Sequence, residues 1–244
     1  MNPRITLAVT RRVLIQLRRD RRTSAMLVVL PCVIMTLLWW MFQDQPDFGF
    51  TALAAALLAL IPFIIMFLVT SVTTLRERTS GTLERLLAMP MGKGDFLVGY
   101  ALAFGLVAAV QSGLAVALSV WALDLDVAGP VWLLLVVAIV DAVLGSALGL
   151  FVSAFARTEF QAVQFMPALV IPQILLCGLF IPREDLPPVL HAVSDVLPLS
   201  YAVDAMRKVT AHTDPAVWGD LFLVAAFAAA ALVLGALTLR RQSD

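Results

Sequence analysis

Six apolar stretches of this chain are long enough, or almost long enough, to cross a lipid bilayer as an α-helix. About 20 apolar residues, each rising 1.5 Å, span the hydrocarbon core. Because lipid offers no hydrogen-bond partner, such stretches must satisfy their own backbone groups as helices. The sequence therefore predicts an all-α integral membrane protein with six transmembrane helices in a single domain, residues 1–244. The predicted spans are residues 25–42, 50–75, 96–123, 131–155, 160–181 and 217–239.

The overall composition agrees with this prediction. Hydrophobic residues make up 61% of the chain and charged residues 14%, whereas soluble domains are about half apolar and a quarter charged. The formal net charge is zero, so we expect no nucleic-acid partner. Cys32 and Cys177 both lie within apolar stretches, and we expect neither a disulfide framework nor a metal site.

The distribution of basic residues predicts the orientation in the membrane. Seven arginines precede Ser24, and further basic residues fall after the second, fourth and sixth spans. Only Arg183, Arg207 and Lys208 of the 17 basic residues fall on the opposite side. Cytoplasmic loops carry the excess of Lys and Arg, so we expect both termini in the cytoplasm.

Two segments on the cytoplasmic side have helical patterns. Residues 3–22 place arginines at helical spacing and leucines on another face, which favours an interfacial helix over an unstructured arginine cluster. Residues 80–89 follow the second span, with Ser80 as a candidate N-cap and Pro90 as a stop. Leucines 83, 86 and 87 give this second helix an apolar face, which must dock on a partner or on the N-terminal helix.

A third segment, residues 182–216, lies on the outer side and is too long for a simple turn. Its first half has apolar residues at helical spacing, with Asp185 as a candidate N-cap. Pro198 ends that helix, and Ser200 is a candidate cap of a second helix that reaches Ala211. We expect two outer helices that cover the bundle like a lid.

Two motifs in these loops resemble a known family. The first is Glu77 with Gly81-Thr82-Leu83-Glu84, Leu86-Leu87 and Pro90 after the second span. The second runs from Gly178-Leu179-Phe180-Ile181-Pro182 to Pro198-Leu199-Ser200-Tyr201 and Arg207. Together, in this order and with six spans, they resemble the type-2 ABC exporter permeases, which include daunorubicin-type drug-resistance permeases and nodulation-factor export permeases.

The resemblance implies a non-catalytic half-transporter in a bacterial plasma membrane. Two permease subunits, identical or homologous, would pair around a central route and bind two ATPase subunits, which hold the ATP and Mg. We expect no cofactor on this chain. The sequence has no GxxxxGK[ST], HExxH or GxSxG motif, which agrees with ATP hydrolysis in a partner chain. The implied substrate is drug-like, a lipid or a glycan.

The resemblance also assigns roles to residues. In the family the loop after the second span is a coupling helix that docks on the ATPase, which here implies Glu77, Gly81, Thr82, Leu83, Glu84, Arg85, Leu86 and Leu87. The family's route is lined by early spans and the fifth span, which here suggests Phe63, Phe67, Met166, Gln173 and Leu176. The outer gate would include Phe180, Pro182, Tyr201, Asp204 and Arg207.

Two features of the spans stand apart from the apolar background. Asp141 lies within the fourth span, where a carboxyl group faces a bundle interior or an aqueous cavity. Gln111 and Ser112 of the third span are at a similar depth and are candidate hydrogen-bond partners. Gly145 and Gly149 form a small-residue stripe that predicts close helix packing within one subunit.

Two other functions stay open at this stage. A proton- or ion-coupled carrier could use Asp141 as its coupling acid, and a membrane scaffold would not transport at all. The carrier hypothesis does not explain why a cytoplasmic loop contains a helix with an apolar face. We therefore favour the ABC exporter permease.

Overall fold

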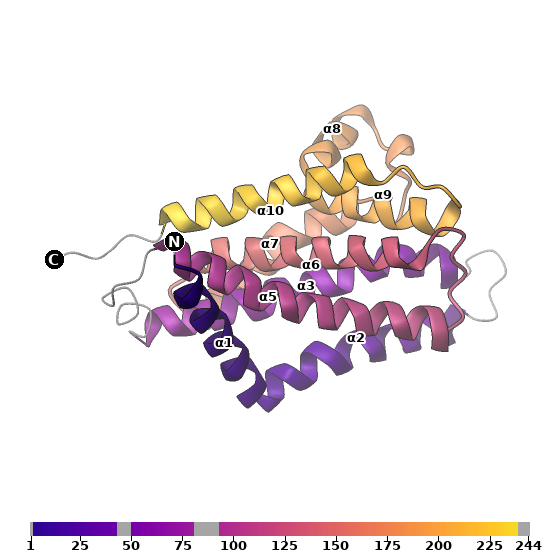
Figure 1. The fold of residues 1–244 in the computed structure, drawn as a ribbon. Coiled ribbons are helices and arrows are strands. Elements are labelled where there is room, and N and C mark those ends of the chain that lie inside the picture. The colour runs from indigo at the N-terminus through magenta and orange to yellow at the C-terminus, as the bar shows by residue number, and fades with distance from the viewer. Residues whose placement is uncertain (1, 43–49, 81–92, 239–244) are drawn as a thin grey trace.

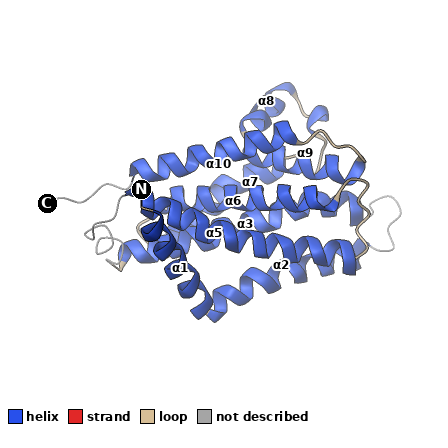
Figure 2. Ribbon diagram, viewed as in Figure 1, coloured by secondary structure: helices blue, strands red, loops and turns tan. Residues whose placement is uncertain are grey.

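The computed structural model describes residues 2–42, 50–80 and 93–238. Within these ranges the chain forms helices and connecting loops, with no strand (Figure 2). Six of the helices are long and apolar enough to cross a membrane. The predicted all-α architecture with six candidate membrane helices is confirmed.

The centre of the bundle is the pair α3 (Phe50–Thr79) and α6 (Val131–Ser153), which share the most extensive contact. At Gly145 a Cβ atom would lie 2.4 Å from the Phe63 carbonyl oxygen, and at Gly149 a Cβ would lie 2.4 Å from that of Phe67. Glycine therefore lets the two helix backbones touch. The small-residue stripe packs inside one subunit, as predicted.

Four further membrane helices surround this pair (Figure 1). They are α2 (Arg21–Phe42), α5 (Lys93–Ala117), α7 (Glu159–Leu176) and α10 (Trp218–Thr238). The end of α5 continues into a π-helical turn, η1 (Leu118–Ala122), in which the Leu123 N–H donates to the Leu118 carbonyl at 3.1 Å. Few residues of α2 and α7 are buried, so in a membrane these helices face lipid or another chain.

The N-terminal helix α1 (Pro3–Arg19) packs against the start of α5. The Thr10 hydroxyl donates to the Gly99 carbonyl at 3.0 Å, and a Cβ at Gly99 would lie 2.7 Å from Val9 Cγ1. The helix ends earlier than the predicted residue 22 because Asp20 closes it and caps α2, accepting from the Thr23 N–H at 3.1 Å. The result is a sharp elbow between α1 and α2.

The outer segment folds back along the bundle instead of standing beyond its end (Figure 1). α7 ends at Leu176, five residues before the predicted end of the fifth span, and Gly178 takes a φ of +88° that only glycine adopts readily. A short turn, η2 (Arg183–Asp185), then leads to α8 (Pro188–Val196) and α9 (Pro198–Ala211).

The second outer helix, α9, is an integral part of the core. Its N-terminal end meets α7, where the Leu199 N–H donates to Gln173 Oε1 at 3.3 Å. Its C-terminal end meets the α5–α6 loop, where the Gly129 N–H donates to the Val209 carbonyl at 2.9 Å. Residues between these ends, such as Val203 and Met206, are fully buried.

Two predicted caps in this segment are wrong. Asp185 lies in η2, and the N-cap position of α8 is Pro187. Ser200 lies inside the first turn of α9, which begins at Pro198 because proline fits the first turn of a helix. Ser200 instead makes a hydrogen bond with Ser194 of α8 at 3.0 Å.

Candidate functional site

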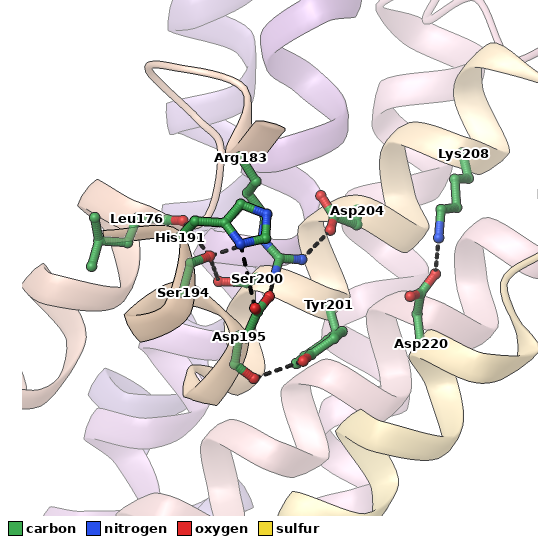
Figure 3. A network of polar contacts seen from close by, with 10 residues as sticks. All are labelled: Leu176, Arg183, His191, Ser194, Asp195, Ser200, Tyr201, Asp204, Lys208 and Asp220. Atoms are coloured by element: carbon green, nitrogen blue, oxygen red, sulfur yellow. Dashed lines mark hydrogen bonds and ion pairs between the residues drawn. The ribbon is translucent and has the colours of Figure 1, made fainter. Parts of the chain in front are cut away.

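The guanidinium group of Arg183 is the centre of a polar network that joins the two outer helices (Figure 3). It donates to Ser194 Oγ at 2.8 Å and to Asp195 Oδ1 at 2.5 Å, both in α8. It also pairs with Asp204 of α9 and stacks over the Tyr201 ring, 5.1 Å from the ring centre. Charge-assisted bonds of this kind are strong, so Arg183 holds α8 against α9.

Neutral groups extend this network to α7. Ser194 Oγ donates to the Leu176 carbonyl at 2.9 Å. Because a serine has one hydroxyl hydrogen, Ser200 must donate the hydrogen bond between the two serines. The Tyr201 hydroxyl donates to the Asp195 carbonyl at 2.6 Å. These hydrogen bonds thus hold α8 against both the end of α7 and the start of α9.

Burial and charge shift the pKa values of Arg183 and Asp204 in opposite directions. Burial raises the pKa of Asp204 above its ordinary value, and the hydrogen bond and charge of Arg183 offset only part of that rise. Burial lowers the pKa of Arg183, but the hydrogen bond and charge of Asp204 outweigh it, so the net shift is upward. Arg183 is therefore a permanent cation, and the network depends on carboxylates to balance it.

Beside this network lies a cleft of about 630 Å³ with an unusual density of titratable side chains. Lys208 is engaged by Asp220 of α10, with 2.6 Å between Nζ and Oδ2. The guanidinium of Arg207 has no ion pair with any described residue. The cleft is lined by Pro182, Arg183, Glu184, His191, Asp195, Tyr201, Asp204, Arg207, Lys208, Ala211 and His212.

The structure brings together most of the predicted outer-gate residues. Pro182, Tyr201, Asp204 and Arg207 all line the cleft. Phe180 does not line it; its side chain is 68% exposed. Sequence reasoning missed Arg183, the residue at the centre. The available signal was a single arginine that precedes two predicted helices, each of which carries an aspartate, Asp195 and Asp204.

At the opposite end of the protein, three successive residues at the end of α3 contact three different elements. Arg76 pairs with Glu159 of α7, with 2.7 Å between Nε and Oε1. Glu77 pairs with Arg12 of α1 at 3.3 Å. Arg78 donates to the Ser153 carbonyl at the end of α6 at 3.1 Å. Neighbouring residues of an α-helix point about 100° apart, which is why each reaches a different partner.

One predicted ATPase contact, Glu77, lies between helices in this structure. Its side chain is 4% exposed and pairs with Arg12 of α1, and its contact with an ATPase stays a prediction. The other predicted contacts, residues 81–87, lie outside the described residues.

The predicted route residues occupy different environments. Phe63 and Phe67 of α3 are fully buried, so in this conformation they belong to the core of the subunit. Gln173 is also buried, and its amide donates a hydrogen bond to the Leu169 carbonyl and accepts one from the Leu199 N–H. Met166 and Leu176 are partly exposed on α7. Of the predicted route residues, only these two on α7 are therefore placed where they can line a route between two subunits.

Asp141 is completely buried, but the predicted hydrogen bonds are not formed. Neither of its carboxyl oxygens has a hydrogen-bond partner among the described residues. Ser112 donates instead to the Ala138 carbonyl at 3.1 Å, and the Gln111 amide is itself unpartnered within the described ranges. The prediction that Gln111 and Ser112 form hydrogen bonds with Asp141 is therefore wrong.

Comparison with known proteins decides the family. The model of the ABC-2 type transporter family matches residues 5–210, which is most of the chain. The chain belongs to the ABC-2 type transporter membrane family. The matched residues include the first five apolar helices and most of the outer segment that follows them.

Several curated proteins are similar to parts of this ABC-2 chain. A probable multidrug ABC transporter permease, YbhR of Escherichia coli, is 29% identical over 63% of this chain and 42% of its own length. The linearmycin resistance permease protein LnrN of Bacillus subtilis is 25% identical over 78% of this chain and 50% of its own. The matches thus span half or less of these relatives.

Proposed function

We propose that this chain is the membrane-spanning permease subunit of an ABC exporter in a bacterial plasma membrane. Its ABC-2 family membership supports this proposal, and its relatives include proteins named as multidrug and resistance permeases. A drug-like amphiphile is accordingly the substrate class we favour. The excess of basic residues at the termini and after the second span supports a cytoplasmic location for both ends.

The observation that carries the proposal is the attachment of the cytoplasmic end of α3. Residues 76–78 bond to α7, α1 and α6, and they directly precede the predicted coupling helix, residues 80–89. In an exporter, ATPase subunits that bind ATP and Mg must pass their movement into the membrane domain. A helix end fastened to three neighbours transmits such movement to all of them.

The exposed side of α7 is the surface we assign to a second permease subunit. α7 is the least apolar of the six candidate spans and one of the two that are least buried. Gln164 is exposed on this helix, and a polar amide is unfavourable against lipid tails. A route between two α7 helices gives Gln164, Met166 and Leu176 a polar or protein-lined environment.

The network of Arg183 then serves as the outer gate of this route. α8 is held by Arg183 and by the two serines next to the end of α7. Opening on the outer side requires the contacts between Arg183 and α8 to break while those with α9, which is part of the core, are kept.

Copurification of the ATPase tests the proposal. Burying two or three leucines is worth several kcal/mol, roughly 1.5–3 kcal/mol each, so Leu86→Asp combined with Glu84→Arg is expected to abolish ATPase binding and export together. The matched control makes the same two kinds of change on the outer segment, Val189→Asp with Glu184→Arg, and is expected to keep the ATPase bound.

The same experiment separates the exporter from its alternatives. A proton-coupled carrier does not receive its energy through the cytoplasmic loop, so the Leu86→Asp, Glu84→Arg variant would continue to transport. Full ATP-dependent export by this variant, with the ATPase still bound, would contradict the assignment of the loop.

A further inference from the structure

A groove of about 490 Å³ lies where the elbow of α1 and α2 faces α5. Figure 1 shows the two helices meeting at this elbow, on the side of the bundle away from α10. The volume is in the range of small-molecule sites, about 300–1,000 Å³. The groove shares no residue with the outer cleft or with residues 76–78 of α3. It is lined by Leu14, Leu17, Arg18, Ser24, Leu27, Val28, Leu106, Val107, Val110 and Gln111.

The wall of this groove contains a buried polar group that lacks a partner. Gln111 is 2% exposed, and neither the nitrogen nor the oxygen of its amide has a hydrogen-bond partner within the described ranges. An amide buried in this way is unfavourable. Rotation of the side chain would turn the amide toward the groove, where a hydrogen-bonding ligand could satisfy it.

The rim of the groove carries a cation. Arg18 is exposed, and no ion pair joins it to another described residue. Ser24, by contrast, is already satisfied, because its hydroxyl donates to the Leu17 carbonyl at 2.8 Å. Two other exposed arginines of the elbow, Arg19 and Arg21, add to the positive charge. Clusters of this kind beside the inner leaflet attract anionic lipids.

The remaining wall is apolar and open to the membrane. Val110 is 61% exposed and Leu106 is 53% exposed, both on the face of α5 toward the elbow. The groove thus offers three chemistries in one place: an apolar wall, an amide that needs a partner, and a cation at the rim. A ligand that matches all three must be an acidic amphiphile with a hydrogen-bond acceptor near its apolar part.

We propose that this groove binds an anionic glycerophospholipid of the inner leaflet. The acyl chain lies along the leucines and valines, an ester carbonyl accepts a hydrogen bond from the Gln111 amide, and the phosphate pairs with Arg18. A zwitterionic lipid matches the wall and the amide but has a cation next to its phosphate, so it is the weaker ligand.

Lipid titration of the purified protein, followed by native mass spectrometry, tests the site with phosphatidylglycerol and phosphatidylcholine. We expect the wild type to bind phosphatidylglycerol about 5–10-fold more tightly, which is about the effect of one arginine beside an anionic lipid. Arg18→Gln is expected to remove this preference. Gln111→Leu is expected to weaken both lipids alike. Arg11→Gln is the matched control, which changes the same residue type outside the groove and should leave both affinities unchanged.

Three results would overturn the proposal. One is equal binding of the two lipids by the wild type, which would mean that lipid tails merely cover an apolar surface. Another is that Arg11→Gln has the same effect as Arg18→Gln, which would mean general attraction of anionic lipids to the basic helix α1. The third concerns Val110→Trp, which fills the groove from an exposed position and should abolish selective binding. If it instead separates protein oligomers and leaves lipid binding intact, a second copy of the chain occupies the groove.

Discussion

Arg76 and Glu159 form a two-point ion pair between the C-terminal end of α3 and the first turn of α7. Arg76 Nε lies 2.7 Å from Glu159 Oε1, and Nη2 lies 3.0 Å from Oε2. The two side chains are 55% and 53% exposed, and exposed pairs contribute about 0–1 kcal/mol to stability. The geometry fixes how α7 is oriented on α3, although it stabilises the fold little.

This relationship gives the first prediction. Arg76→Gln should shift the free energy of unfolding by less than about 1 kcal/mol and keep the ATPase bound, yet lower export. The reason is that α7 loses its ion pair with the end of α3 that precedes the predicted coupling helix. Export measured in sealed cells, beside thermal unfolding of the purified protein, checks both parts. Exchange of the charges, Arg76→Glu with Glu159→Arg, should recover part of the export.

The control for this pair is Arg157→Gln. Its side chain is exposed near the same end of the bundle and forms no ion pair with a described residue. Equal losses of export in Arg157→Gln and Arg76→Gln would mean that surface charge, and not the link between α3 and α7, is what matters.

The second prediction concerns the contact between α3 and α6. Gly149→Ala places a Cβ 2.4 Å from the Phe67 carbonyl oxygen, a backbone atom that cannot move aside alone. The two central helices must separate, and overpacking of this kind costs about 1–3 kcal/mol. Gly105→Ala in α5 is the control, because its nearest neighbour would be Val143 Cγ2 at 3.8 Å, an ordinary contact. The melting temperature should fall only for Gly149→Ala.

The sequence predicted the membrane helices well because their signal is local. A run of apolar residues of sufficient length has few alternatives to a spanning helix. The end of α7 shows where this signal fails. Leu179, Phe180 and Ile181 continue the apolar run, but the chain has already turned at Gly178, whose φ is +88°. Hydropathy alone does not predict where the backbone reverses direction within an apolar run.

The site was harder to predict because its contacts join distant parts of the chain. Glu77 looked like an exposed charge in a loop, but Arg12, 65 positions earlier, buries it. α9 looked like a surface helix because it carries Asp204 and Lys208. Arg183 and Asp220 neutralise these charges, which lets the rest of the helix enter the core. Such pairings follow from the fold and leave no trace in local spacing.

The third prediction concerns Asp141, which has no hydrogen-bond partner in the described part of the bundle. A buried polar group without a partner lowers stability by about 1–3 kcal/mol, so Asp141→Leu should raise the melting temperature or leave it unchanged. Asp141→Asn should keep normal export. If the asparagine variant folds, binds the ATPase and exports nothing, Asp141 has a direct role in moving protons or substrate, as the carrier hypothesis requires.

The fourth prediction tests the orientation. In a variant without Cys32 and Cys177, a cysteine at Asp126, in the exposed loop between α5 and α6, should react with an impermeant thiol reagent added to intact cells. A cysteine at Arg157, exposed between α6 and α7, should react only after the cells are opened. The reverse pattern would place the basic residues outside and contradict the orientation that the exporter needs.

The fifth prediction concerns pH and the Arg183 network. Burial raises the pKa of Asp204 above its ordinary value, so between the unfolded and folded pKa values the folded state binds more protons. The contribution of Asp204 to stability is therefore full at acidic pH, falls as the pH rises through this window, and is constant above it. Arg183→Met removes the partner that lowers this pKa, so the window should extend to higher pH and the protein should lose stability at pH 7. Melting temperatures of the wild type, Arg183→Met and Arg183→Met with Asp204→Asn, measured from pH 4 to pH 8 (about the range in which a raised Asp titrates), check this. The double variant should lose the added pH dependence. If Arg183→Met melts with the same pH profile as the wild type, Arg183 and Asp204 are not coupled, and the outer helices are held together by their apolar contacts and serines alone.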